Sequence, residues 1–185
     1  MTGDNEFEGS FEALDLHDAV RRAQFVGHLG LVNTAWKFLE TAVRDGDLRR
    51  VWDLVHESLR TEWAQQWVID NRQAIVAAGH HESSVVAGLA EHKPAHELWV
   101  HFERVYVRSL RRELPDPTCW GIGANTRVVG ADLEALLVHD MSQLPADGVL
   151  RPGATSGYVF PLIFRRVGDQ WLLAFVGTNQ LLNDL

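Results

Sequence analysis

The feature that most constrains the fold is a pair of β-branched and aromatic runs near the carboxyl terminus, residues 158–166 and 171–177, joined by Val-Gly-Asp-Gln. Runs of this composition around a short turn are typical of a β-hairpin with both strands largely buried. Most of the chain before residue 114 follows a helical pattern instead. Helices followed by an antiparallel sheet predict an α+β domain.

Hydrophobic residues recur at the spacing of three and four that is typical of helices through the first part of the chain. Asn33 and Asp47 can serve as N-caps, and Gly46 can end a helix. Gly27 and Gly30 are expected to interrupt the first helical segment. The expected helices cover residues 14–24, 33–46, 47–78, 85–91 and 98–114.

The size of the chain fits one domain, since it has 185 residues, of which 46% are hydrophobic and 23% charged. We expect an acidic, partly ordered N-terminal extension over residues 1–30 and a single α+β domain over residues 31–185. Strands are expected at residues 119–129 and 133–141 and in the terminal hairpin.

The net charge of -8 argues against a nucleic-acid partner, which would call for a basic surface. Cys119 is the only cysteine, so an intramolecular disulfide and a zinc site of several thiolates are excluded. The acidic N-terminus does not resemble a secretory signal, and no run of about 18 apolar residues occurs. We therefore expect a cytoplasmic protein with no membrane partner.

Nine histidines raise the question of a metal site. His92 and His96 have the spacing of two ligands on one helical face, but Pro94 between them would disrupt that helix. No His-Glu-x-x-His motif occurs. We expect neither a metal site nor a cofactor.

Three segments follow one another in a familiar order: a first helix ending in Val-Arg-Asp-Gly-Asp47-Leu, a second carrying Val51-Trp-Asp-Leu, and a hairpin with Arg-Val-Gly-Asp-Gln-Trp171. Over residues 33–177 this order resembles the nuclear transport factor 2-like (SnoaL-like) superfamily. The resemblance implies a cystatin-like α+β cone, in which the helices pack in the concave face of a strongly curved antiparallel sheet. Its members include enzymes and non-catalytic proteins, so the fold does not select an activity.

No catalytic residue can be transferred from that family. Its epoxide hydrolases use an Arg-x-Asp strand motif, and none occurs in the β half of this chain. Its isomerases use a pocket tyrosine with two carboxyl groups of raised pKa. The two tyrosines here, Tyr106 and Tyr158, lie in no matching motif.

Aromatic side chains fall on the expected inner faces of the helices, where they could line a pocket for a flat apolar ligand or simply fill the core. Gln66 and Asp70 add polar groups beside them, and a buried polar group calls for a partner. The candidate ligand-binding residues are Trp36, Trp63, Gln66, Trp67, Asp70, Trp99, Phe102 and Tyr106.

Asp70 and His139 are the candidates for general acid–base catalysis. An imidazole titrates near neutral pH, and a nearby carboxylate would hold its tautomer. Glu134 cannot be that carboxylate on a regular strand, because alternation sends it and His139 to opposite faces. The partner would have to come from another element.

The expected function is the binding of a small, mainly apolar molecule in an aromatic-lined pocket, by a homodimer that associates through the exposed face of its sheet. Two alternatives stay open. One is a cofactor-independent lyase, isomerase or hydrolase acting on a hydrophobic substrate. The other is a dimeric interaction module without a ligand.

Overall fold

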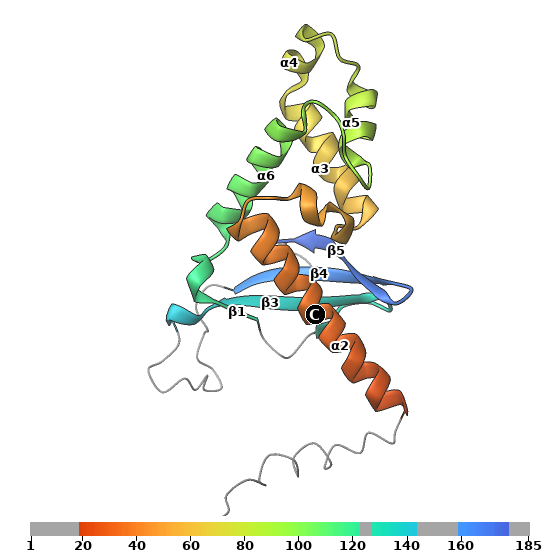
Figure 1. The fold of residues 1–185 in the computed structure, drawn as a ribbon, viewed down its shortest axis with the longest axis vertical. Helices are drawn as coiled ribbons and strands as arrows, with labels where there is room; N and C mark the ends of the chain where they lie inside the picture. The colour runs from red at the N-terminus through yellow and green to blue at the C-terminus, as the bar shows by residue number, and fades with distance from the viewer. Residues whose placement is uncertain (1–18, 123–126, 144–158, 178–185) are drawn as a thin grey trace, which may run out of the picture.

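The computed structural model describes residues 19–122, 127–143 and 159–177, so Tyr158 and residues 1–18 lie outside it. Helices come first and the antiparallel sheet last, which confirms the α+β class. In Figure 1, the helices α3 to α6 form a column that narrows toward α4, and α2 crosses the sheet. No helix in the described ranges is long and apolar enough to cross a membrane.

The helical part of the chain contains five α-helices of the described residues and, between the first two of them, one π-helical and one 3-10 helical segment. They are α2 (Ala19–Phe38), the π-helical η1 (Leu39–Arg44), the 3-10 helical η2 (Arg49–Leu54), α3 (Glu57–Asp70), α4 (Arg72–Ala77), α5 (Glu82–Ala90) and α6 (Trp99–Glu113). Two single 3-10 turns, η3 (Pro117–Cys119) and η4 (Met141–Gln143), flank the first strands.

The first helix is longer than expected. The predicted break at Gly27 and Gly30 and the predicted start at Asn33 are wrong, because α2 runs through all three positions. A glycine inside a helix costs only about 1 kcal/mol, and α2 buries Leu31 and Phe38 completely. Packing against the core therefore overrides the local preference of the glycines.

The single long helix expected over residues 47–78 is also wrong. Between η2 and α3, Val55 takes an extended conformation and forms a parallel bridge to Leu173, and the N–H of His56 donates to the Leu173 carbonyl at 2.8 Å. The helical region is thus interrupted where it meets the edge of the sheet. The predicted helices near residues 85–91 and 98–114 are confirmed as α5 and α6.

The sheet has the order β1-β3-β4-β5, and every pairing between these strands is antiparallel. The strands are β1 (Trp120–Ile122), β2 (Arg127–Val128), β3 (Leu133–Asp140), β4 (Val159–Val167) and β5 (Gln170–Val176). The terminal hairpin is confirmed, and Gly168 in its turn has a φ of +60°. Cys119 belongs to η3 rather than to a strand. The sheet is not strongly curled in Figure 1, so closure into a cone is not confirmed.

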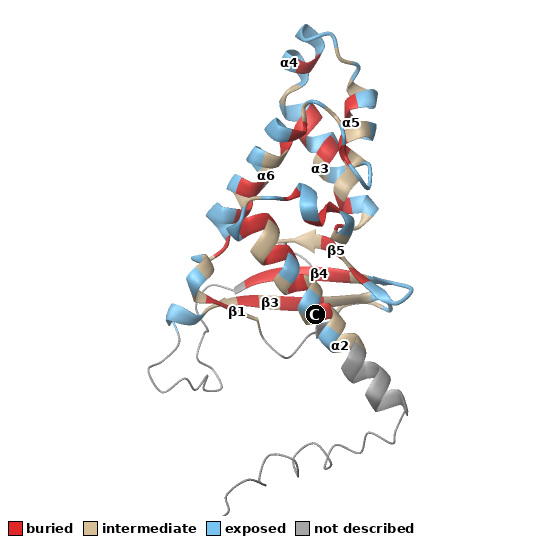
Figure 2. Ribbon diagram, viewed as in Figure 1, coloured by how far each residue is buried: buried red, intermediate tan, exposed pale blue. Residues whose placement is uncertain are grey.

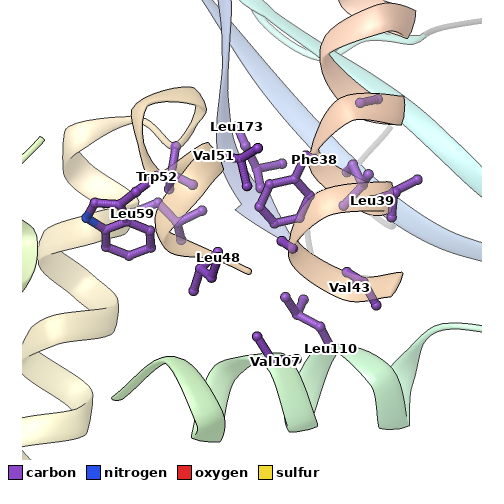
Figure 3. Close-up of a cluster of buried hydrophobic side chains, with 14 of the residues drawn as sticks. Phe38, Leu39, Val43, Leu48, Val51, Trp52, Leu59, Val107, Leu110 and Leu173 are labelled. Atoms are coloured by element: carbon purple, nitrogen blue, oxygen red, sulfur yellow. The ribbon is translucent and has the colours of Figure 1, made fainter. Parts of the chain in front are cut away.

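One hydrophobic core joins the sheet to the helices. In Figure 2, buried residues run along the strands and up the inward sides of the helices. Figure 3 shows where α2, η2, α6 and β5 meet: Phe38, Leu110 and Leu173 point into the space between these elements, and Trp52 points to the other side of η2. All four side chains are nearly or completely buried. Five of the candidate aromatic residues lie beside this junction, on α3 and α6.

Candidate functional site

Six aromatic side chains from three elements form one cluster of rings. Trp52 comes from η2, two indoles come from α3, and three rings come from α6. The members of this aromatic cluster are Trp52, Trp63, Trp67, Trp99, Phe102 and Tyr106. The structure therefore brings together five of the predicted ligand-binding residues.

The rings of the aromatic cluster touch directly. Trp63 and Tyr106 are stacked, with centroids 4.6 Å apart and planes 17° apart. Trp52 meets Trp99 edge to face at 5.1 Å and Phe102 at 5.6 Å. Such arrangements are favourable beyond the area that they bury. Side chains thus occupy the space between η2, α3 and α6.

Burial in the aromatic cluster is graded. Trp52 and Trp99 are completely buried, and Trp67 is 5% exposed, whereas Trp63 and Tyr106 are half-buried. The Tyr106 hydroxyl donates to the Trp63 carbonyl at 2.7 Å. Burial raises the pKa of Tyr106, and the charge of Asp70 raises it further. The stacked pair therefore forms the side of the cluster that meets solvent.

Three hydrogen-bond donors inside the aromatic cluster lack a partner. They are the indole N–H groups of Trp52, Trp67 and Trp99, none of which meets an acceptor in the described part of the chain. An unpaired buried donor costs about 1–3 kcal/mol. Three of them in one cluster mark a place where water or a ligand acceptor would stabilise the protein.

Three other predicted ligand-binding residues lie outside this cluster. Trp36 is half-buried on α2, where it packs against the hydrophobic core. Gln66 and Asp70 are exposed on α3, and the Gln66 amide donates to the Asp70 carboxylate at 2.8 Å. The two polar residues thus satisfy each other at the surface.

The structure does not bring Asp70 and His139 together. Asp70 ends α3 beside α4, at the narrow end of the column in Figure 1, whereas β3 lies in the sheet. Leu136 and Val138 of β3 belong to the core, so alternation directs His139 to the other face of the sheet. The Nδ1 atom of His139 is buried without a hydrogen-bond partner.

Several histidines of the described residues have local partners. His92 Nδ1 lies 3.1 Å from an Arg60 guanidinium nitrogen, and His96 Nδ1 accepts from the backbone N–H of Leu98 at 3.2 Å. No three His, Cys, Asp or Glu side chains of the described ranges gather as metal ligands would.

Trp52 is the member of the aromatic cluster that the sequence analysis missed. In the single helix expected over residues 47–78, the inner stripe passes through its neighbour Val51. The structure replaces the first part of that helix by a 3-10 segment with an irregular backbone at Val51, where φ is -122°. Both residues are then fully buried. The Val-Trp-Asp-Leu segment, in which the tryptophan follows the inward-facing Val51, was the available signal.

No protein-family model, curated protein or solved structure matches this chain. The likeness to the nuclear transport factor 2-like superfamily therefore depends on the sequence segments and on the order of the elements. The function has to be inferred from the geometry of the described residues.

Proposed function

We propose that this chain binds a small molecule at the aromatic cluster between η2, α3 and α6. The unpaired indole N–H groups of Trp52, Trp67 and Trp99 are the observation that carries the proposal. A ligand with a hydrogen-bond acceptor would remove the cost of burying them unpaired, and the rings would hold its apolar part. The ligand is therefore small, flat and mainly apolar, with at least one acceptor.

Entry to the aromatic cluster is through the stacked pair of Trp63 and Tyr106. These are its half-buried members, and one hydrogen bond from Tyr106 to the Trp63 backbone ties α6 to α3 there. A ligand would take the place of part of this contact. The proposal thus includes a local rearrangement of the two side chains on binding.

Nitrogen-15 NMR of the tryptophan indoles tests the proposal, because each of the seven Trp residues contributes one side-chain N–H signal. We expect a binding member of a library of flat apolar compounds to shift the signals of Trp52, Trp67 and Trp99 most. Trp67→Phe keeps an aromatic ring but removes one donor, and it should raise the Kd about tenfold or more.

The matched control is Trp36→Phe, which changes an indole outside the cluster and should leave the Kd unchanged. The folded fraction of both variants is checked by circular dichroism. A library that shifts no indole signal of the cluster, or a Trp67→Phe variant that binds as tightly as the original chain, would contradict the proposal.

Homodimer formation through the sheet is a second candidate function, with or without a ligand. The face of the sheet turned away from the core carries the half-buried apolar side chains of Leu137 and Phe175. An apolar sheet face of this kind fits a second copy of the chain. Leu137→Glu should then convert a dimer to a monomer in sedimentation equilibrium, and a wild-type chain that sediments as a monomer would contradict the idea.

Membership in the nuclear transport factor 2-like superfamily forms part of this proposal. The order of helices and antiparallel strands supports it. The closure of the sheet into a cone is supported by the sequence resemblance alone. A cytoplasmic location is proposed from the single cysteine.

The alternative of a cofactor-independent enzyme would need an acid–base pair other than Asp70 with His139. Turnover of a hydrophobic substrate that survives Asp70→Asn and His139→Gln together would point to such a pair.

A further inference from the structure

Two adjoining hollows beside η2 form one groove. Their volumes are about 420 and 230 Å³, and both are lined by Asp53 and His92. Four segments that are far apart in the sequence meet here: the middle of α2, η2, the connection between α5 and α6, and the β4–β5 turn. We call this the basic groove, after Lys37, Arg49, Arg50, His92 and Lys93.

Positive charge is concentrated in the basic groove. The chain has only two lysines, and both line it, although the net charge of the chain is -8. Two arginines join them, against the carboxylates of Asp53 and Asp169. In the described ranges these four cations form no ion pair, whereas Arg72 pairs with Glu82 at 2.8 Å. The groove therefore attracts anions.

Arg60 contacts His92, one of the residues that line the basic groove. It lies 3.1 Å from His92 Nδ1, and its own Nε atom is buried without a partner. Burial lowers the pKa of Arg60, while the carboxylates of Glu57 and Asp53 act in the opposite direction. Because a guanidinium only donates, His92 Nδ1 must accept, and the proton of the neutral imidazole lies on Nε2. His92 thus has a second nitrogen that can only donate.

Arg49 is also held in place. Its guanidinium lies over the Trp99 ring, 5.4 Å from the centroid, and its backbone N–H donates to Glu103 at 2.9 Å. A cation fixed in this way loses less conformational freedom when it binds an anion. Pro94 and Trp171 add apolar wall to the same groove.

We propose that the basic groove binds the phosphate monoester of a small molecule. Lysine, arginine and the Nε2–H of His92 all donate, and a phosphate dianion offers three strong acceptor oxygens that a guanidinium can bind in pairs. The volume of the groove suits a compound of metabolite size, and its apolar wall suits the organic part. This site borders the aromatic cluster where Arg49 lies over Trp99, but neither proposal depends on the other.

Isothermal titration at constant ionic strength tests the assignment with three probes: ribose 5-phosphate, inorganic phosphate and citrate. Ribose 5-phosphate should bind saturably and more tightly than inorganic phosphate, and citrate should bind much more weakly than either. Lys37→Ala combined with Lys93→Ala should raise the Kd for ribose 5-phosphate about tenfold or more. Both lysines are exposed, so the unfolding midpoint without ligand should stay unchanged.

The matched control is Arg104→Ala combined with Arg108→Ala, which removes the same charge from exposed positions of α6 outside the groove. It should leave the Kd unchanged. The proposal is overturned if the two double variants weaken binding equally, if citrate binds as tightly as ribose 5-phosphate, or if inorganic phosphate binds more tightly than the monoester.

Discussion

Replacing Gly46 by alanine should destabilise the fold at the end of η1 for two reasons: the backbone conformation there favours glycine, and the added methyl group would crowd Arg111. Gly46 has a φ of +83°, and an added Cβ would lie 3.0 Å from a terminal guanidinium nitrogen of Arg111. The Arg111 guanidinium donates to the carbonyl of Val43 at 2.6 Å and to that of Arg44 at 2.9 Å. These carbonyls end η1, so the arginine closes that helical segment.

The expected cost has two parts. The left-handed backbone conformation costs a residue with a Cβ about 1–2 kcal/mol. Displacing Arg111 weakens two hydrogen bonds from a charged group, whose complete loss costs about 1.5–3 kcal/mol each, and solvent at this exposed side chain reduces that loss. We expect about 2–3 kcal/mol in total for Gly46→Ala.

Gly79→Ala is the matched control, because Gly79 has a φ of +81° and an added Cβ would meet nothing within 4 Å. It should cost only the backbone part. Urea unfolding of both variants should show that Gly46→Ala is more destabilising by about 1 kcal/mol. The difference should disappear when Arg111→Ala is added to each variant. Equal costs for the two glycine variants, or a difference that survives the removal of Arg111, would refute the explanation.

Two further predictions concern titrating groups. Burial, and then the charge of Arg165, lower the pKa of His56 below 6.5, so the unfolded chain binds more protons and the free energy of unfolding should fall as the pH drops from 7.5 to 5.5. Urea unfolding across that range should show a smaller fall for His56→Asn, since asparagine can also cap α3; an unchanged fall would contradict this. In an ultraviolet titration, Tyr106 should ionise well above pH 10, because burial raises its pKa. Two tyrosines ionising together near pH 10 would show that Tyr106 is not buried against Trp63.

The terminal hairpin and α6 are predictable because their signals are local. The hairpin combines two β-branched runs with a turn in which Gly168 takes a φ of +60°, a conformation that glycine adopts without strain. In α6, Trp99, Phe102 and Leu110 recur at helical spacing, and all three are buried. In both cases neighbouring residues specify the element without help from the rest of the chain.

The break between η2 and α3 could not be predicted in the same way. Hydrophobic residues continue at helical spacing through Val51, Val55 and Leu59, and all three are buried as a helix would bury them. The chain nevertheless extends at Val55, because Leu173 at the edge of β5 offers it a bridge and offers His56 a carbonyl acceptor. That partner lies more than a hundred residues away in the sequence.

The two candidate sites also differ in whether neighbouring residues in the sequence are enough to predict them. Most of the aromatic cluster follows from the periodicity of α3 and α6, so five of its members were predictable. The basic groove is assembled from four distant segments, and Lys37 and Lys93 each look like an ordinary solvated residue in the sequence. Only the packing of Trp171 against α2, where its indole donates to the Gly27 carbonyl at 2.9 Å, brings the β4–β5 turn to the groove.

The first residues of α3 and α5 share a short sequence pattern that the usual N-cap preferences do not include. Both α3 and α5 begin at the glutamate of a His-Glu-Ser segment, at Glu57 and Glu82. His56 Nδ1 accepts from the N–H of Ser58, and His81 Nδ1 lies 2.8 Å from the Ser83 hydroxyl. In both helices a histidine takes the N-cap position, and the glutamate places a negative charge at the positive end of the helix dipole. Since Nδ1 of His56 can accept only while it is unprotonated, this N-cap makes the start of α3 sensitive to acid.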